Sequence, residues 1–132
     1  MQAHLRVARP VRNLERSAAM YQRALGLHRI GSFTDHAGFD GVFLGRPGMD
    51  YHFELTYCRR QPISPTPGPE DLLVFYIADQ RSWRTRCQRF LDAGLTETDP
   101  INPYWKQRGR TFQDCDGYQL VLQRARWPAS HE

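Results

Sequence analysis

One pattern of hydrophobic and polar positions occurs twice along the chain. Residues 5–8 (LRVA) and 72–77 (LLVFYI) each predict a strand, and each leads into an amphipathic segment that ends in a Gly-Leu pair, at 26–27 and 94–95. The two pairs lie 68 positions apart (94 − 26 = 68). Such an offset indicates two copies of one supersecondary unit, and two copies commonly build a shared site between them.

Two helices are predicted from apolar side chains that recur at helical spacing. The first carries four of them at i, i+4, i+7 and i+11: Leu14, Ala18, Tyr21 and Leu25. Asn13 is its expected N-cap and Gly26 its expected C′ residue, since both residue types favour those positions. The second helix repeats the design ahead of Gly94: Trp83, Cys87, Phe90 and Leu91.

Short strands are expected after each helix. They fall at 29–33, 41–44 and 51–56 in the first half, and at 96–98, 110–113 and 119–123 in the second. Asp116-Gly117 predicts a hairpin turn before the last strand, because glycine readily adopts a positive φ. The resulting order, βαβββ-βαβββ, predicts an α+β fold of two modules.

The boundary between the two modules is expected in a proline-rich segment, 58–71. It holds four prolines and one glycine, which disfavour both helix and sheet interior: Pro62, Pro65, Pro67, Gly68 and Pro69. We therefore predict one domain over 1–132, with module one at 4–57 and module two at 72–124. A segment of this length can link two packed modules without forming a domain of its own.

The amino-acid composition restricts which binding partners and which cellular compartment are expected. No apolar run approaches the roughly 20 residues of a membrane span, and residues 1–6 lack a signal-peptide core, so no membrane partner is expected. Three widely spaced cysteines suggest reduced thiols and a cytoplasmic location. The net charge of +4 comes from 17 arginines and Lys106 (17 + 1 = 18), but the arginines alternate with acids and apolar residues, which favours a solvated surface over a nucleic-acid partner.

Several motifs resemble those of the vicinal oxygen chelate superfamily, which contains glyoxalase I, fosfomycin and bleomycin resistance proteins, and extradiol dioxygenases. The resemblance covers nearly the whole chain and rests on the order and spacing of residues 13–17 (NLERS), 20–21 (MY), 25–27 (LGL), 54–57 (ELTY) and 112–118 (FQDCDGY). In the last of these, Cys115 replaces the proline of the F-x-D-P-D-G-x signature. Residues 102–105 (NPYW) also resemble a tract in small bacterial glyoxalase-like proteins. The resemblance implies the glyoxalase/bleomycin resistance/dioxygenase fold, two modules whose curved sheets form a cup around a small-molecule cleft.

The resemblance also implies four metal-ligand positions, on the first and last strand of each module. In this chain they fall on Arg6, Glu54, Leu72 and Val121. Only Glu54 can ligate a metal, because arginine offers no lone pair and leucine and valine have no donor atom. No resident cofactor is therefore expected. The alternative is a divalent metal in a rearranged site, using His4, His52 and Glu54 as two histidines and a carboxylate.

The same strands supply the candidate ligand-binding residues. With period two, His52 and Glu54 share one face of their strand and Arg6 shares the matching face of the first strand, with Leu5 and Val7 against the helix. Arg6 could replace a metal as the counter-charge of Glu54, and the pair could hold a carboxylate or phosphate. A purely structural ion pair is an equal alternative, since a buried charge must be paired.

The other candidate residues carry simpler alternatives. His52 could orient a ligand, or be a packed, hydrogen-bonded side chain. Tyr104 and Trp105, expected in a loop before a strand, could line a pocket or cap the core. Val121 joins the candidates through its implied metal-ligand position.

Two classes of function follow from these residues. The first is a metal-free protein that binds a small organic molecule in the cleft, of the sequestration or resistance type. The second is a metal-dependent lyase or dioxygenase-type enzyme with the rearranged site. A homodimer is expected in both cases, because symmetric pairing is the commonest way to cover open sheet faces and edges.

Overall fold

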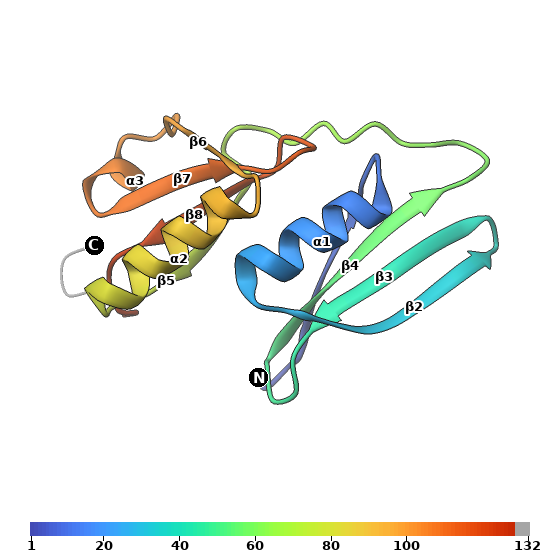
Figure 1. Cartoon of the computed structure of the whole chain (residues 1–132), viewed down its shortest axis with the longest axis horizontal. Helices are drawn as coiled ribbons and strands as arrows, with labels where there is room; N and C mark the ends of the chain where they lie inside the picture. Colours follow the sequence, from blue (N-terminus) through green and yellow to red (C-terminus); the bar gives the residue numbers. More distant parts are fainter. Residues whose placement is uncertain (129–132) are drawn as a thin grey trace. The chain divides into compact units, whose positions relative to one another are not determined.

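The computed structural model of the chain describes residues 1–128 (Figure 1). These residues form two compact units, the first Met1–Pro65 and the second beginning at Thr66. Each unit has a four-stranded sheet with a helix against one face, and each follows the order βαβββ, the second with one extra short helix. The expected α+β fold of two modules is thereby confirmed.

The first unit is built from five elements. They are β1 (Leu5–Pro10), α1 (Leu14–Leu25), β2 (His28–His36), β3 (Phe39–Gly45) and β4 (Tyr51–Cys58). The strands lie in the order β1-β4-β3-β2, with β1 parallel to β4 and the other pairs antiparallel. The first strand of the unit, β1, is therefore hydrogen-bonded to the last, β4.

Helix α1 begins and ends where its capping residues predict. The Asn13 side chain accepts a hydrogen bond from the backbone N–H of Arg16 at 3.0 Å, and Gly26 adopts a left-handed φ of 67°. Its apolar side packs on β3 and β4, and the core of the unit consists of fully buried side chains from both layers: Ala18, Tyr21, Ala24, Val42, Leu44, Phe53 and Leu55.

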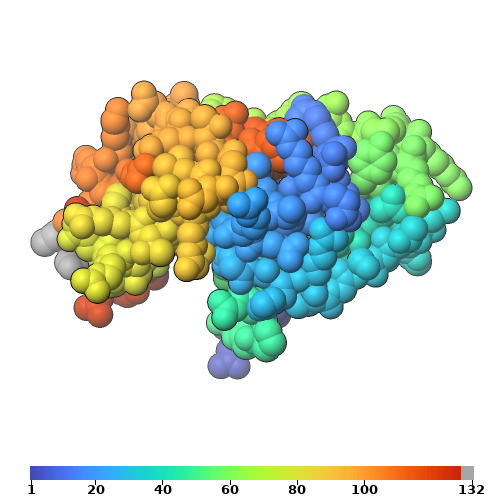
Figure 2. Space-filling view, viewed as in Figure 1, coloured from blue at the N-terminus to red at the C-terminus, as the bar shows by residue number. Residues whose placement is uncertain are grey.

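The second unit has six elements. They are β5 (Leu72–Tyr76), α2 (Gln80–Asp92), β6 (Thr96–Thr98), α3 (Tyr104–Gln107), β7 (Gly109–Gln113) and β8 (Gln119–Gln123). The sheet order β5-β8-β7-β6 repeats that of the first unit, again with its first and last strands parallel. Figure 2 shows the outer surface of α2, in yellow, exposed on the second unit.

Helix α2 is fixed by its cap and by two fully buried side chains. The Asp79 carboxylate accepts from the backbone N–H of Ser82 at 2.8 Å, and Cys87 and Phe90 are 0% exposed. Leu91, which the helical spacing assigned to the same apolar side, is 38% exposed. It lies one residue beyond Phe90, and a step of about 100° along the helix turns its side chain toward solvent. That assignment was wrong.

Two further expectations need correction. Tyr104 and Trp105 belong to the short helix α3 and not to a loop; Pro103 precedes the helix with a φ of −64°, which suits a helix start. Leu5 is 60% exposed and does not join the core, since it is the first residue of β1.

The predicted turn before β8 is confirmed, with Gly117 at a φ of 92°. Within residues 1–128, no helix has the length and apolarity needed to cross a membrane.

Candidate functional site

The pairing of three strands brings the charged candidates of the first unit together. Arg6 on β1 is the register partner of His52 on β4, and Glu54 lies two residues further along β4. Phe43 on β3 is the register partner of Glu54. Register partners point to the same face of a sheet, so all four side chains lie on the face opposite the buried Phe53 and Leu55. We call these four residues, with His4, the Arg6 cluster.

A chain of hydrogen bonds runs through the Arg6 cluster. The Nε–H of Arg6 donates to Nε2 of His52 at 2.9 Å, and Nδ1 of His52 contacts Nε2 of His4. The two imidazole rings stack with centroids 4.7 Å apart. Because arginine can only donate, Nε2 of His52 must carry a lone pair. In the neutral ring the proton then sits on Nδ1 and is donated to His4, whose Nε2 must also be unprotonated.

The guanidinium of Arg6 is held from two further sides. Its Cζ lies 4.9 Å from the centroid of the Phe43 ring, a cation–π contact. Its Nη1 lies 3.9 Å from Oε2 of Glu54, so the predicted ion pair exists but is too long for a direct hydrogen bond. The Arg6 side chain is 51% exposed and that of Glu54 18%. The cation is therefore fixed in place while half of it still faces solvent.

The electrostatics of the cluster favour the uncharged form of His52. Partial burial of the ring lowers the pKa of His52 below its usual value, and the neighbouring Arg6 and His4 lower the pKa further, while Glu54 opposes them. A neutral His52 is also the form that the hydrogen bond from Arg6 requires. Geometry and charge therefore favour the same protonation state.

Phe43 is the member of the cluster that sequence reasoning missed. It lies in the apolar run 42–44, which reads as ordinary core. A signal was present in Gly41 and Gly45, which lie two residues before and two residues after Phe43. On a strand these positions share the face of Phe43, so the ring has no side chain beside it along β3. A Cβ on Gly45 would lie only 3.1 Å from Cβ of His52, so the glycine also gives His52 its room.

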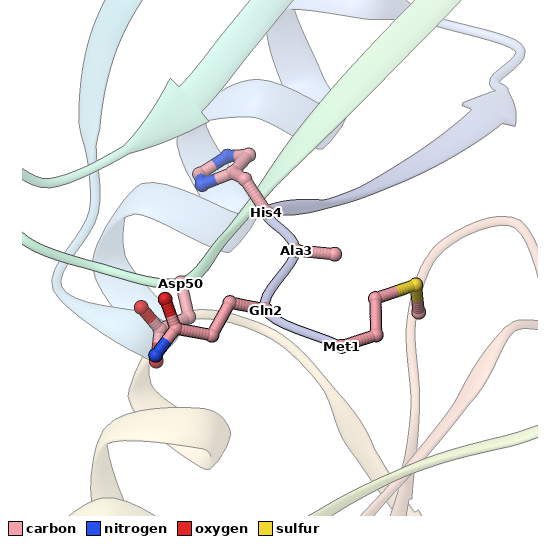
Figure 3. Close-up of a pocket in the computed structure, with 5 residues that line it drawn as sticks. All are labelled: Met1, Gln2, Ala3, His4 and Asp50. Atoms are coloured by element: carbon pink, nitrogen blue, oxygen red, sulfur yellow. The ribbon is translucent and has the colours of Figure 1, made fainter.

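A hollow of about 650 Å³ opens beside His4 at the start of the chain (Figure 3). It is lined by Met1, Gln2, Ala3, His4 and Asp50. Figure 3 shows the Gln2 side chain directed toward Asp50, while the Met1 side chain points away from both. The hollow is wide and mostly polar, so it gives solvent access to the His4 end of the cluster.

The remaining candidates lie in the second unit. Trp105, on α3, lines a pocket of about 270 Å³ together with Leu72 and Val74 of β5. Tyr104 packs edge-on against Trp105, with ring centroids 4.9 Å apart. Val121 is 0% exposed beneath this face of the sheet, where it is the register partner of Val74.

The residues present do not fit the metal that the resemblance implies. Among the four implied positions only Glu54 has a donor atom, and its neighbour on β1 is the Arg6 guanidinium, a fixed positive charge. The alternative set of His4, His52 and Glu54 does not fit a metal either, because Nε2 of His52 already accepts a hydrogen bond from Arg6. Over the described part of the chain, no three His, Cys, Asp or Glu side chains gather in a way that could hold a metal ion.

Comparison with known proteins agrees with this architecture. Residues 5–56 match the YycE-like N-terminal domain, and residues 70–124 match the YycE-like C-terminal domain. The chain is 38% identical over 120 residues to the uncharacterized protein YycE of Bacillus subtilis, which covers 91% of this chain and 86% of that protein. The matched regions correspond to the two sheet-and-helix units.

Crystal structures give the wider relationship. That of Bacillus subtilis YycE superposes with a TM-score of 0.87 at 35% identity, covering 99% of this chain and 95% of that one. The fosfomycin resistance protein FosX of Mesorhizobium loti (TM-score 0.71, 17% identity, 93% and 91% covered) and the trypanothione-dependent glyoxalase I of Leishmania major (0.70, 18%, 93% and 86%) share the fold. The chain belongs to the YycE-like family.

Proposed function

We propose that this protein binds a small anionic organic molecule on the open face of its first sheet, without a resident metal ion, as a sequestration or resistance protein does. One observation carries the proposal: Arg6 is a fixed, half-exposed cation on the sheet face opposite α1. A planar guanidinium held in this way can donate two parallel hydrogen bonds to two oxygens of a carboxylate, phosphate or phosphonate.

The donors of Arg6 are only partly used. Within residues 1–128, Nε donates to His52 and Nη1 faces Glu54 at 3.9 Å, but Nη2 makes no hydrogen bond or ion pair. Nη2 and the exposed edge of Nη1 can therefore receive an acidic group. Because Phe43 and His52 already restrict the side chain, little conformational entropy remains to be lost on binding.

Glu54 determines how strong this attraction is. Its carboxylate offsets part of the Arg6 charge, which reduces the affinity for a bare inorganic anion. An organic ligand can add contacts with the Phe43 ring and the adjacent glycine surface. The arrangement therefore favours a molecule that carries both an acidic group and an apolar or aromatic body.

Calorimetric titration with defined probes tests the proposal. We choose phenylphosphonate and fosfomycin as anions and benzyl alcohol as the uncharged control. Arg6→Gln should weaken phenylphosphonate binding by about tenfold or more, because a charged, bidentate contact is lost. Glu54→Gln should strengthen it, since the repulsion between two acidic groups is removed.

The matched control is Arg46→Gln, which removes an arginine from the same unit at a position outside the cluster. It should leave the affinity unchanged. Equal affinity in the Arg6 and Arg46 variants would refute the assignment of Arg6. Elemental analysis of protein purified without tag or chelator tests the metal: content near one ion per chain would replace this proposal with a metal-dependent one.

A further inference from the structure

The pocket of the second unit differs in character from the Arg6 cluster. Its volume is about 270 Å³. Its walls are mainly apolar: Pro69, Leu72, Val74, Pro100, Ile101 and Trp105. The polar members are Glu70 and Asn102, and the Asn102 Oδ1 atom already accepts from the backbone N–H of Tyr104 at 3.0 Å.

The charge of this pocket is opposite in sign to the net charge of the whole chain. The protein has 18 basic residues and a net charge of +4, yet no Lys, Arg or His lines the pocket. Its one charged group is the exposed Glu70, which has no ion-pair or hydrogen-bond partner among residues 1–128. In a protein so rich in arginine, an unpaired carboxylate at the rim of an apolar pocket favours a positively charged occupant.

Unpaired oxygens lie on the same face of the sheet. Gln119 is the register partner of Leu72, and its buried Oε1 has no hydrogen-bond partner among the described residues. The same is true of Thr111 Oγ1, on a residue that is 1% exposed and pairs in register with Val121. Buried polar atoms in folded proteins are nearly always satisfied by protein, water or ligand. Neither residue is in the pocket lining, so these oxygens do not carry the choice of ligand, which rests on Glu70 and Trp105.

Trp105 provides the remaining element of recognition. Its position in the pocket wall is secured by Gly109, where a Cβ would lie 2.5 Å from the Trp105 carbonyl oxygen. The close approach of α3 to β7 depends on this glycine. An indole ring attracts an ammonium group as well as an apolar body.

We propose that this pocket is a binding site for a small organic amine, whose apolar body contacts Leu72, Val74 and Trp105 and whose ammonium group pairs with Glu70. The site is separate in residues and opposite in charge from the Arg6 cluster, and it does not depend on the function proposed there.

Phenethylamine is the probe, with 2-phenylethanol as its uncharged analogue and phenylacetate as its anionic analogue. Titration followed by calorimetry and by the NMR signal of the Trp105 indole N–H should show the amine binding at least about tenfold more tightly than the alcohol. Glu70→Gln should abolish that preference and leave alcohol binding unchanged. Asp99→Asn is the control: it removes an exposed carboxylate of the same unit that pairs with Lys106 and lies outside the pocket lining, and the preference for the amine should remain.

Two results would overturn the proposal. One is equal binding of amine and alcohol to the unmodified protein, and the other is amine binding that survives Glu70→Gln undiminished. A failure to bind any probe up to about 10 mM would do the same. Arg6→Gln should leave phenethylamine binding intact, so the outcome here is independent of the outcome for the anion site.

Discussion

Arg6 and His52 are joined by a hydrogen bond of 2.9 Å from Nε to Nε2, and this bond decides which protonation state of His52 the fold accepts. A protonated ring would present N–H against N–H, so the contact exists only with neutral histidine. The guanidinium charge acts in the same direction. Arg6 thus controls the chemistry of a residue that lies on a different strand.

The first prediction follows directly. Arg6→Gln should raise the pKa of His52 toward its ordinary value, because a positive neighbour is removed while burial and His4 still lower the pKa and Glu54 still raises it. Titration of the His52 ring signals by NMR in both proteins measures the change. Arg46→Gln serves as the reference, and a His52 pKa that is unchanged in the Arg6 variant would contradict the electrostatic account.

The second prediction concerns stability at acidic pH. The pKa of His52 is lowered in the folded protein, so the unfolded chain takes up the proton first as pH falls. The free energy of unfolding should therefore decline from about pH 6.5 downward, through the lowered folded-state pKa. Urea titrations across this range, with His52→Gln for comparison, should show a flatter pH dependence in the variant. Parallel curves would contradict the prediction.

The third prediction concerns the start of α1. Asn13→Ala should destabilise the protein by about 1 kcal/mol, because the backbone N–H of Arg16 loses its side-chain acceptor. Asn13→Asp keeps an acceptor oxygen and should stay close to the unmodified protein. Chemical denaturation compares the three. A cap that contributes nothing would give equal stability for Ala and Asp.

The fourth prediction separates the three cysteines. Cys87 is 0% exposed, and burial raises the pKa of its thiol although the nearby Arg110 opposes the effect. Cys58 and Cys115 are partly exposed. Alkylation with iodoacetamide, followed by mass spectrometry, should label Cys87 last in the folded protein and all three alike in denaturant. Early labelling of Cys87 would show that α2 opens readily.

The fifth prediction is the oligomeric state. We propose a homodimer, because the first unit leaves Ile30 53% and Phe39 39% exposed, and symmetric pairing is the commonest way to cover such side chains. Sedimentation equilibrium at about 100 μM should give twice the chain mass, as expected for Kd values at or below the micromolar range. A monomer at that concentration would rule the proposal out.

The helices and the main sheet pattern could be predicted because local signals determine them. Asn13 and Gly26 mark the ends of α1 by their own chemistry, and period-two alternation places Phe53 and Leu55 in the core opposite His52 and Glu54. The repeated pattern predicted the element order βαβββ in each module, but not the order of the strands within each sheet. Helix α3 was missed because four residues are too few for helical periodicity to appear.

The candidate site was predicted less completely, because its contacts join residues far apart in sequence. The sequence placed Arg6 near Glu54 but could not show that His52 is the closer partner of Arg6. Phe43 was missed because the run 42–44 is typical of core, although Gly41 and Gly45 on either side of it were a signal. The pocket beside Trp105 depends on the path of residues 100–105 across the sheet, which no local pattern specifies.

The parallel pairing of first and last strands also sets an order for synthesis. Leu5 pairs in register with Tyr51, 46 residues later (51 − 5 = 46), and Leu72 with Gln119, 47 residues later (119 − 72 = 47). As the chain leaves the ribosome, β1 must wait for β4, and β5 must wait for β8. The first sheet can nevertheless form while the second unit is still being translated. In the nascent chain, therefore, only one of β1 and β5 at a time lacks its parallel partner strand.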